Sequence, residues 1–289
     1  MGRKRNTEES IAGTYEISTG ELVVKPDPFR DGAFILDING VPSSHLVPDE
    51  PRALEFEYMR WIAAAVEHLA PGKRLLHLGG GGCSLPRYFA DLWPDSHNTV
   101  VELDAKLAEL IRELADIPSA PRVKIRAGEA RAVTEGFPPN RFDVIVRDVF
   151  AGAVTPESLT TIEFFQHARA TLSPGGLYVA NCGDYPDLQG AKAELAGMAE
   201  VFEHIAVIAD PPMLKGRRYG NIILIGSDTE LPVDGSPQAA ALAKPLLSGA
   251  VPAHCRDESW TRQFFSGALP HRDAPGAVSY THLTLPTKA

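Results

Sequence analysis

The sequence predicts an α/β protein built on a doubly wound, mostly parallel sheet, with an antiparallel hairpin at one edge and a small β-layer before it. Between residues 75 and 209, short apolar runs alternate with amphipathic stretches of helical length. This alternation is typical of a parallel sheet with helices on both faces. The last two apolar runs, 204–209 and 219–227, are joined by a short Pro-rich, basic loop. A connection this short favours an antiparallel edge hairpin.

The first part of the chain predicts short strands in residues 14–47, which contain TYEIS, ELVVK and AFILDI. The pair Asn39-Gly40 after an apolar run is a strong hairpin signal, and repeated prolines argue against helices here. Residues 51–70 then carry apolar side chains at helical spacing, and Pro71-Gly72 ends that helix.

The elements that follow alternate in type. The expected strands are 75–78, 99–103, 122–127, 142–148 and 176–182, followed by the hairpin strands, and the expected helices are 84–93, 105–115, 156–172 and 188–200. We therefore divide the chain into an N-terminal tail and β-hairpin domain (1–50), a Rossmann-like domain (51–230) and a short helical or irregular C-terminal extension (231–277).

The last twelve residues, 278–289, are set apart from the fold. They read VSYTHLTLPTKA and match the translation of a common sequencing adapter. We interpret them as an artefact and exclude them from the reasoning about structure.

Composition narrows the classes of function. The chain has 37 acidic and 28 basic residues, a net charge of -9, which argues against nucleic acid as a partner and suits a cationic substrate or a solubilising surface. Three well-separated cysteines indicate a reducing compartment. There is no apolar run of about 18 residues for a membrane helix, and no cysteine pair or histidine cluster for a metal. We expect a cytoplasmic protein with no metal, nucleic acid or membrane partner.

A run of glycines, Gly79 to Gly82, follows the first strand of the predicted parallel sheet. Such a strand-to-helix turn lies where α/β sheets bind ligands. Gly79 and Gly81 fit the dinucleotide pattern G-x-G-x-x-G, but its third glycine is replaced by Ser84. The run is also compatible with a tight turn that binds nothing.

Acidic residues lie at the ends of the next two strands or just after them. Glu102 lies 21 residues after Gly81, at the position that binds ribose hydroxyls in nucleotide-binding sheets. Asp104 favours the role of a helix cap. Glu129 either accepts a hydrogen bond from an adenine amino group or stands as an acid at a helix start.

The fourth strand ends at Asp148, whose carboxylate could orient an amine or take its proton. Its neighbour Arg147 is interpreted as a surface or ion-pair residue that could lower the aspartate pKa. Asp143, at the other end of the strand, is interpreted as structural.

Five motifs occur in the order LLHLGGGGCSLPRYF, VVELD, PRVKIRAGEA, FDVIVRDVFAG and LSPGGLYVAN. Together they resemble the spermidine synthase (polyamine aminopropyltransferase) family, which has a class I methyltransferase fold, over residues 30 to 228. The resemblance implies decarboxylated S-adenosylmethionine as co-substrate, transfer of its aminopropyl group to an amine, release of methylthioadenosine, and a homodimer.

By position, the resemblance implies that Gly79 and Gly81 shape the cofactor turn and that Glu102 binds the ribose. Glu129 stands where the family has an aspartate near adenine. Asp148 matches the catalytic aspartate that positions the attacking amine, and Tyr58 resembles a tyrosine of the polyamine site.

The chain departs from the family at four positions. Gly82 replaces the aspartate that binds the amino group of the decarboxylated cofactor, and Ala151 replaces a second acid for the polyamine. Ser43 replaces a glutamine, and Phe165 a tyrosine. Since carboxylates anchor cationic amines, the departures keep two alternatives open: an S-adenosylmethionine-dependent methyltransferase, or a non-catalytic nucleoside-binding homologue. Ser84 disfavours a nicotinamide oxidoreductase.

Overall fold

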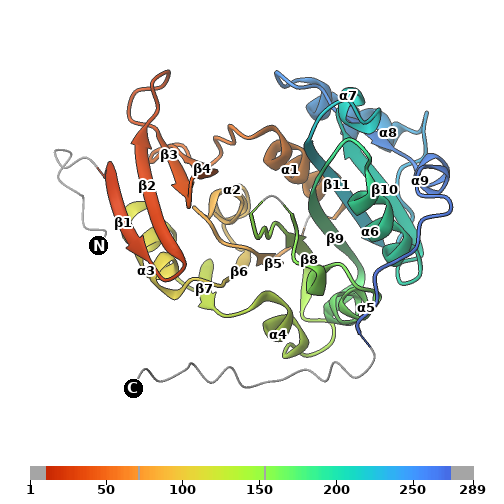
Figure 1. Cartoon of the computed structure of the whole chain (residues 1–289), viewed down its shortest axis with the longest axis horizontal. Helices are drawn as coiled ribbons and strands as arrows, with labels where there is room; N and C mark the ends of the chain where they lie inside the picture. The colour runs from red at the N-terminus through yellow and green to blue at the C-terminus, as the bar shows by residue number, and fades with distance from the viewer. Residues whose placement is uncertain (1–10, 71, 153, 275–289) are drawn as a thin grey trace.

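The structure is a computed structural model and describes residues 11–70, 72–152 and 154–274. Within these residues the strands form two sheets, one of four strands and one of eight. The small sheet lies at one end of the molecule and the C-terminal helices at the other (Figure 1). The segment 278–289 assigned to adapter sequence lies outside the described residues.

The small sheet is an antiparallel meander made by the start of the chain. Asn39 and Gly40 both have positive φ, 53° and 82°, as the tight turn of a two-residue hairpin requires, so the hairpin prediction is confirmed. The strands are β1 (Gly13–Ile17), β2 (Gly20–Pro26), β3 (Phe34–Ile38) and β4 (Val41–Leu46).

The large sheet has the order β12-β10-β11-β9-β8-β5-β6-β7. Neighbours from β7 to β9 are parallel, whereas β11 is antiparallel to both β9 and β10. Its strands are β5 (Arg74–Leu78), β6 (His97–Glu102), β7 (Val123–Ala127), β8 (Phe142–Arg147), β9 (Leu172–Asp184), β10 (His204–Ala209), β11 (Gly220–Ser227) and β12 (His254–Arg256). The doubly wound sheet and the hairpin are confirmed, but the strand outside the hairpin, β12, comes from the C-terminal extension and was not anticipated.

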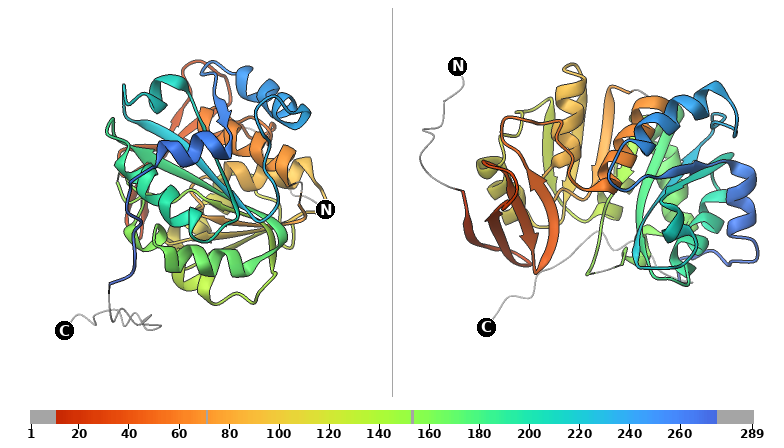
Figure 2. Two further views of the ribbon diagram at one scale, coloured as in Figure 1. Left: turned by 90° about the vertical axis from the view of Figure 1, so that its right-hand side faces the viewer. Right: turned by 90° about the horizontal axis from the view of Figure 1, so that it is seen from above.

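Helices cover both faces of this sheet (Figure 2). Along β8, Ile145 belongs to the apolar cluster under α4, α5 and α6, whereas Val144 and Val146 belong to the cluster under α1, α2 and α8. This alternation is the consequence of the two-residue period of a strand that is buried on both faces. The helices are α1 (Glu57–Leu69), α2 (Ser84–Leu92), α3 (Ala105–Leu114), α4 (Ala130–Glu135), α5 (Ile162–Thr171), α6 (Gln189–Ala199), α7 (Pro211–Leu214), α8 (Pro237–Leu247) and α9 (Glu258–Phe264).

The small sheet is held to the large one through a third apolar cluster. Ile17, Leu22 and Leu36 from the small sheet share this cluster with Leu107 and Ile111 of α3. Burial of each such side chain contributes on the order of 1.5–3 kcal/mol. The small sheet therefore covers the turns that follow β5 and β6.

Two predicted helices have different limits in the structure. The helix expected at 51–70 begins at Glu57, because residues before it form a turn in which the Ala53 amide donates to the Glu50 carbonyl. The helix expected at 156–172 is a short 3-10 turn (Glu157–Leu159) followed by α5. The break occurs because the Thr161 hydroxyl accepts a hydrogen bond from the Phe164 amide and caps a new helix.

Candidate active site

The site lies where the winding of the sheet changes direction. From β5 the chain proceeds outward through β6 and β7, and then returns to place β8 and β9 on the other side of β5. The backbone at Asp148 is tied to β5, since its amide donates to the Leu78 carbonyl at 2.8 Å. Gly79 has φ +92°, and a Cβ there would lie 2.1 Å from the Asp148 carbonyl oxygen. Only glycine fits this close approach of the two strand ends.

A cavity of about 1050 Å³ opens at this edge of the sheet. It is large enough for a nucleoside and a small second ligand, since pockets for drug-sized ligands span roughly 300–1,000 Å³. Among the described residues that line it, the charged ones are all acidic: Glu102, Asp104, Glu129 and Asp148. No Lys or Arg is among these lining residues, so the cavity favours cationic ligands.

The carboxylate of Asp148 is fixed by two side chains. The Asn181 amide donates to Oδ1 at 2.9 Å, and the Tyr58 hydroxyl donates to Oδ2 at 3.2 Å. Burial raises the pKa of Asp148, whereas the hydrogen bonds from Asn181 and Tyr58 and the charge of Arg147 work in the opposite direction. The result is a positioned carboxylate that is more basic than an ordinary aspartate.

Tyr58 reaches this carboxylate from α1, 90 residues earlier in the chain. Burial raises the pKa of Tyr58 well above its ordinary value, and the negative charge of Asp148 adds to the effect. Tyr58 therefore remains protonated and acts as a hydrogen-bond donor. The structure brings together two residues that the resemblance had assigned to the amine side of the site.

Arg147, next to Asp148 in the chain, lies on the opposite face of β8 and is fully buried. The surface interpretation of Arg147 was wrong, and the ion-pair interpretation is confirmed: its Nη2 lies 2.7 Å from Oε2 of Glu194 on α6. Its guanidinium also donates to the carbonyl of Leu159 at 2.9 Å and to that of Asn181 at 3.1 Å. Burial is the largest single influence on the pKa of Arg147 and lowers it, but the combined effects of Glu194, Tyr178 and Cys182 are larger, so the pKa of Arg147 is raised.

Glu102 organises the glycine turn. Its Oε2 accepts hydrogen bonds from the amides of Gly80 at 2.9 Å and Gly81 at 3.1 Å, and its Oε1 accepts one from the Asp104 amide at 3.0 Å. Each carboxylate oxygen has two lone pairs, so Oε1 retains acceptor capacity toward the cavity. This arrangement is compatible with a ribose hydroxyl as an additional donor.

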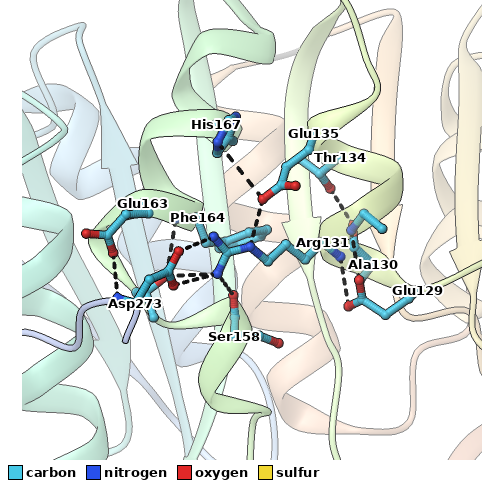
Figure 3. A network of polar contacts seen from close by, with 12 residues as sticks. Glu129, Ala130, Arg131, Thr134, Glu135, Ser158, Glu163, Phe164, His167 and Asp273 are labelled. Carbon is cyan, nitrogen blue, oxygen red and sulfur yellow. Dashed lines mark hydrogen bonds and ion pairs between the residues drawn. The ribbon is translucent and has the colours of Figure 1, made fainter. Parts of the chain in front are cut away.

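Asp104 and Glu129 both stand at helix starts. Asp104 accepts from the Leu107 amide at 2.8 Å and caps α3, as predicted. Glu129 accepts from the amides of Arg131 and Ala132 at 2.9 and 2.8 Å and caps α4 (Figure 3). The structure thus shows the helix-start role for Glu129. Its contact with adenine stays a prediction that would use the remaining lone pairs.

The C-terminal extension is bonded to elements beside the site. Arg131 on α4 forms a bidentate ion pair with Asp273 and also donates to the Ser158 carbonyl at 3.1 Å (Figure 3). The Ile162 amide donates to the His271 carbonyl at 3.0 Å. These contacts fasten the turn before α5, whose Ser158 lines the cavity.

Gly82, where the family has an acid, is packed against the small sheet. Its amide donates to the Ser44 hydroxyl at 2.8 Å, and a Cβ at Gly82 would lie 2.6 Å from Ser44 Cβ and 3.0 Å from Leu36 Cδ2. A side chain at this position would require β4 to move. The missing carboxylate is therefore coupled to the docking of the N-terminal sheet.

The other three departures have different surroundings. Ala151 is exposed and lines the cavity, in a bridge with Val154. Ser43 lines the cavity, but its hydroxyl donates to the Val41 carbonyl at 2.9 Å. Phe165 is fully buried in the core under α5 and does not belong to the cavity.

Sequence reasoning missed Asn181, Tyr219 and Asn221, which line the cavity on the side of β9 and β11. Asn181 carried a usable signal, because it is a lone amide in the otherwise apolar run GLYVANC. Its Oδ1 is buried without a hydrogen-bond partner. Nothing in the local sequence distinguished Tyr219 or Asn221 from ordinary residues at the start of a strand.

The described part of the chain contains no group of three or more His, Cys, Asp or Glu side chains that could hold a metal ion. Cys83, Cys182 and Cys255 are free thiols. No helix in the described ranges is long and apolar enough to cross a membrane.

The sheet order, in which β11 is antiparallel to its neighbours β9 and β10 and β12 pairs antiparallel at the edge, and the cavity at the glycine turn define a class I methyltransferase-like protein. Human methyltransferase-like protein 13, solved in complex with SAH, is 25% identical, with a TM-score of 0.54 over 66% of this chain and 90% of that chain. No family model matches the chain.

Two further relatives are more specific. A crystal structure of a probable spermidine synthase from Corynebacterium glutamicum is 57% identical, with a TM-score of 0.89 over 96% of this chain and 100% of that one. A polyamine aminopropyltransferase from Vibrio vulnificus is 28% identical over 206 residues, which cover 70% of this chain and 67% of the relative. The chain belongs to the spermidine synthase (polyamine aminopropyltransferase) family.

Proposed function

We propose that the protein transfers the aminopropyl group of decarboxylated S-adenosylmethionine to an amine and releases methylthioadenosine. The observation that carries this proposal is the Asp148 carboxylate, held by Asn181 and Tyr58 in a cavity whose charged lining residues are all acidic. An amine that binds in its ammonium form and a sulfonium donor are both cationic, and this lining stabilises both.

The donor would occupy the half of the cavity formed by β5, β6 and β7. Glu102 would accept a hydrogen bond from a ribose hydroxyl through Oε1, while Oε2 holds the glycine turn. Glu129 would face the adenine amino group with the lone pairs that the helix start leaves free. Gly79 and Gly81 keep the turn free of side chains where the donor would approach the backbone.

The acceptor amine would lie beside Asp148. In the reaction the nitrogen forms a bond to the propyl carbon next to sulfur. The carbon–sulfur bond breaks, and its electron pair neutralises the sulfonium. Because an ammonium nitrogen has no free electron pair, the amine must first give up one proton, and the Asp148 carboxylate, whose raised pKa makes it a better proton acceptor, would take it before the attack. The secondary amine formed then keeps its positive charge. Because Asn181 and Tyr58 fix both carboxylate oxygens, the attacking nitrogen is oriented as well as deprotonated.

The charge of the cavity favours one of the two donor molecules under consideration over the other. Decarboxylated S-adenosylmethionine carries a sulfonium and an ammonium, whereas S-adenosylmethionine also carries a carboxylate. A carboxylate would lie among acidic groups, with no Lys or Arg among the described lining residues to pair with it. The electrostatics therefore support the decarboxylated donor.

Methyl transfer from S-adenosylmethionine is the second candidate, and Gly82 favours it. Gly82 has no side chain, and its amide donates to the Ser44 hydroxyl. An acid at this position would bind the ammonium group of the donor. Without that acid, the preference for an ammonium tail over an amino-acid tail depends on the general charge of the cavity alone.

Product analysis separates the two candidates. The purified protein is incubated with either donor and with 1,4-diaminobutane, n-pentylamine or 2-phenylethylamine, and products are quantified by mass spectrometry. We expect methylthioadenosine from the decarboxylated donor. Formation of S-adenosylhomocysteine from S-adenosylmethionine, with no methylthioadenosine, would replace the proposal by methyl transfer.

Two variants then separate chemistry from donor binding. Asp148→Asn should lower the rate of aminopropyl transfer by roughly 10²–10⁴-fold and leave donor affinity in calorimetry nearly unchanged. Glu102→Gln should instead weaken donor binding, because an amide is a poorer acceptor for the turn and for ribose. An Asp148→Asn enzyme with normal turnover would remove Asp148 from the mechanism.

A further inference from the structure

The acceptor half of the cavity has a single carboxylate among its described lining residues. In the sheet order, β8, β9 and β11 form one side of the site, and β5, β6 and β7 the other. Glu102, Asp104 and Glu129 all lie at or just after the ends of strands of the donor side. Asp148 is therefore the one acid among the described lining residues of the acceptor side. Asp184, at the end of β9, is not among the lining residues; it accepts from the amides of Tyr185 and Ala191.

The rest of the acceptor side is neutral and rich in carbon. Tyr58, Val149, Phe150, Tyr219 and Asn221 line it. At its outer edge Tyr219 packs against Tyr185, with ring centroids 5.3 Å apart, and the two residues are 42% and 52% exposed. An exposed aromatic pair beside a cavity provides apolar contact surface for a ligand.

Three basic residues lie close to Tyr219 in the chain. Lys215, Arg217 and Arg218 precede Tyr219 in the loop between β10 and β11, and their residues are exposed. Arg218 is neutralised by Asp210 at 2.9 Å. Lys215 and Arg217 add positive charge to this loop, which disfavours a second ammonium. The Asp184 carboxylate, whose charge also acts on Tyr219, is already bonded to two backbone amides.

We infer that the acceptor is a primary monoamine with an apolar alkyl or arylalkyl body, and not a diamine. Its one nitrogen would lie at Asp148, and its body would pack against the aromatic wall formed by Tyr58, Phe150 and Tyr219. A second ammonium in this space would lose hydration without gaining a carboxylate, whereas a methyl group there would gain apolar contact. This inference rests on the proposed aminopropyl transfer.

A pair of isosteric amines tests the inference directly. In n-pentylamine a methyl group replaces one of the two ammonium groups of 1,4-diaminobutane, with the same number of heavy atoms. With decarboxylated S-adenosylmethionine as donor, we expect kcat/KM from methylthioadenosine release to be at least about tenfold higher for n-pentylamine, the factor that corresponds to about 1.4 kcal/mol. 2-Phenylethylamine should react at least as well as n-pentylamine.

A charge placed on the aromatic wall provides the matched test. Tyr219→Asp should lower the ratio of kcat/KM for n-pentylamine to that for 1,4-diaminobutane by about tenfold or more, because it supplies the missing counterion. Tyr219→Asn removes the same ring without adding charge, and its ratio should fall by less than about threefold. These thresholds follow from the larger free energy of a charge-assisted hydrogen bond compared with a neutral one.

The outcomes separate the inference from the proposed function. Equal or better turnover of 1,4-diaminobutane, or the same ratio in Tyr219→Asp and Tyr219→Asn, would overturn the monoamine inference and leave aminopropyl transfer in place. If no amine released methylthioadenosine while S-adenosylmethionine gave S-adenosylhomocysteine, both would be overturned.

Discussion

Replacing Arg147 with methionine should strongly destabilise the protein, although Arg147 does not line the cavity. The side chain is fully buried and has three partners: the Glu194 carboxylate and the carbonyls of Leu159 and Asn181. Glu194 is itself 2% exposed. Without the guanidinium, its charge would remain in the core with no counterion, and breaking a buried pair in this way costs about 3–5 kcal/mol.

The magnitude can be measured by urea and thermal unfolding. One kcal/mol corresponds to about 2–4 °C in Tm for a domain of 150–250 residues, so we expect a loss of roughly 6–20 °C. The matched control is the double variant Arg147→Met/Glu194→Leu, which replaces the ion pair by apolar side chains. Such replacements are close to neutral, and the double variant should regain most of the lost stability.

The pH dependence gives an independent check. Burial raises the pKa of Glu194, and Arg147 is the main influence that opposes this effect. In Arg147→Met the folded-state pKa of Glu194 should therefore rise further above its unfolded value. The part of the destabilisation that comes from the Glu194 charge is then greatest above that folded pKa and disappears as the pH falls below the unfolded one. A single variant within about 1 kcal/mol of wild type, or a double variant as unstable as the single one, would refute the reasoning.

Two further variants test the geometry around Asp148. Asn181→Ala removes a hydrogen bond that lowers the Asp148 pKa. The acid limb of the pH profile of kcat/KM for aminopropyl transfer should therefore move to higher pH. An acid limb at the same pH as in the wild type would mean that Asp148 does not control it. Gly79→Ala should destabilise the fold in urea unfolding by more than Gly32→Ala, since both have positive φ but only the Cβ at position 79 would meet a backbone oxygen, 2.1 Å away. The positive φ costs an alanine about 1–2 kcal/mol at either position. Equal losses of unfolding free energy in the two variants would contradict the close approach at Gly79.

The sequence by itself determined the class of fold and most of the strands along the chain. Apolar periodicity depends on neighbours along the chain, so LLHL, TVVEL and FDVIVRD were readable as buried strands, and Asn39-Gly40 as a hairpin. In a parallel sheet the strand ends share one edge, so Glu102 and Asp148 could be assigned to one site before any contact was known. The short helix α4 escaped this reasoning, because six residues are too few for a helical period to show.

Only the tertiary structure decided which side chains act on Asp148. Asn181 reaches it from 33 residues away and Tyr58 from 90, and such pairings depend on strand order and helix packing, which leave no local trace. The same holds for Arg147, whose buried partner Glu194 lies on α6. Gly82 needed both the sequence and the structure. The sequence revealed that an acid is missing at this position, and the structure supplied the physical reason. Ser44 of the N-terminal sheet fills the space that a side chain at position 82 would need.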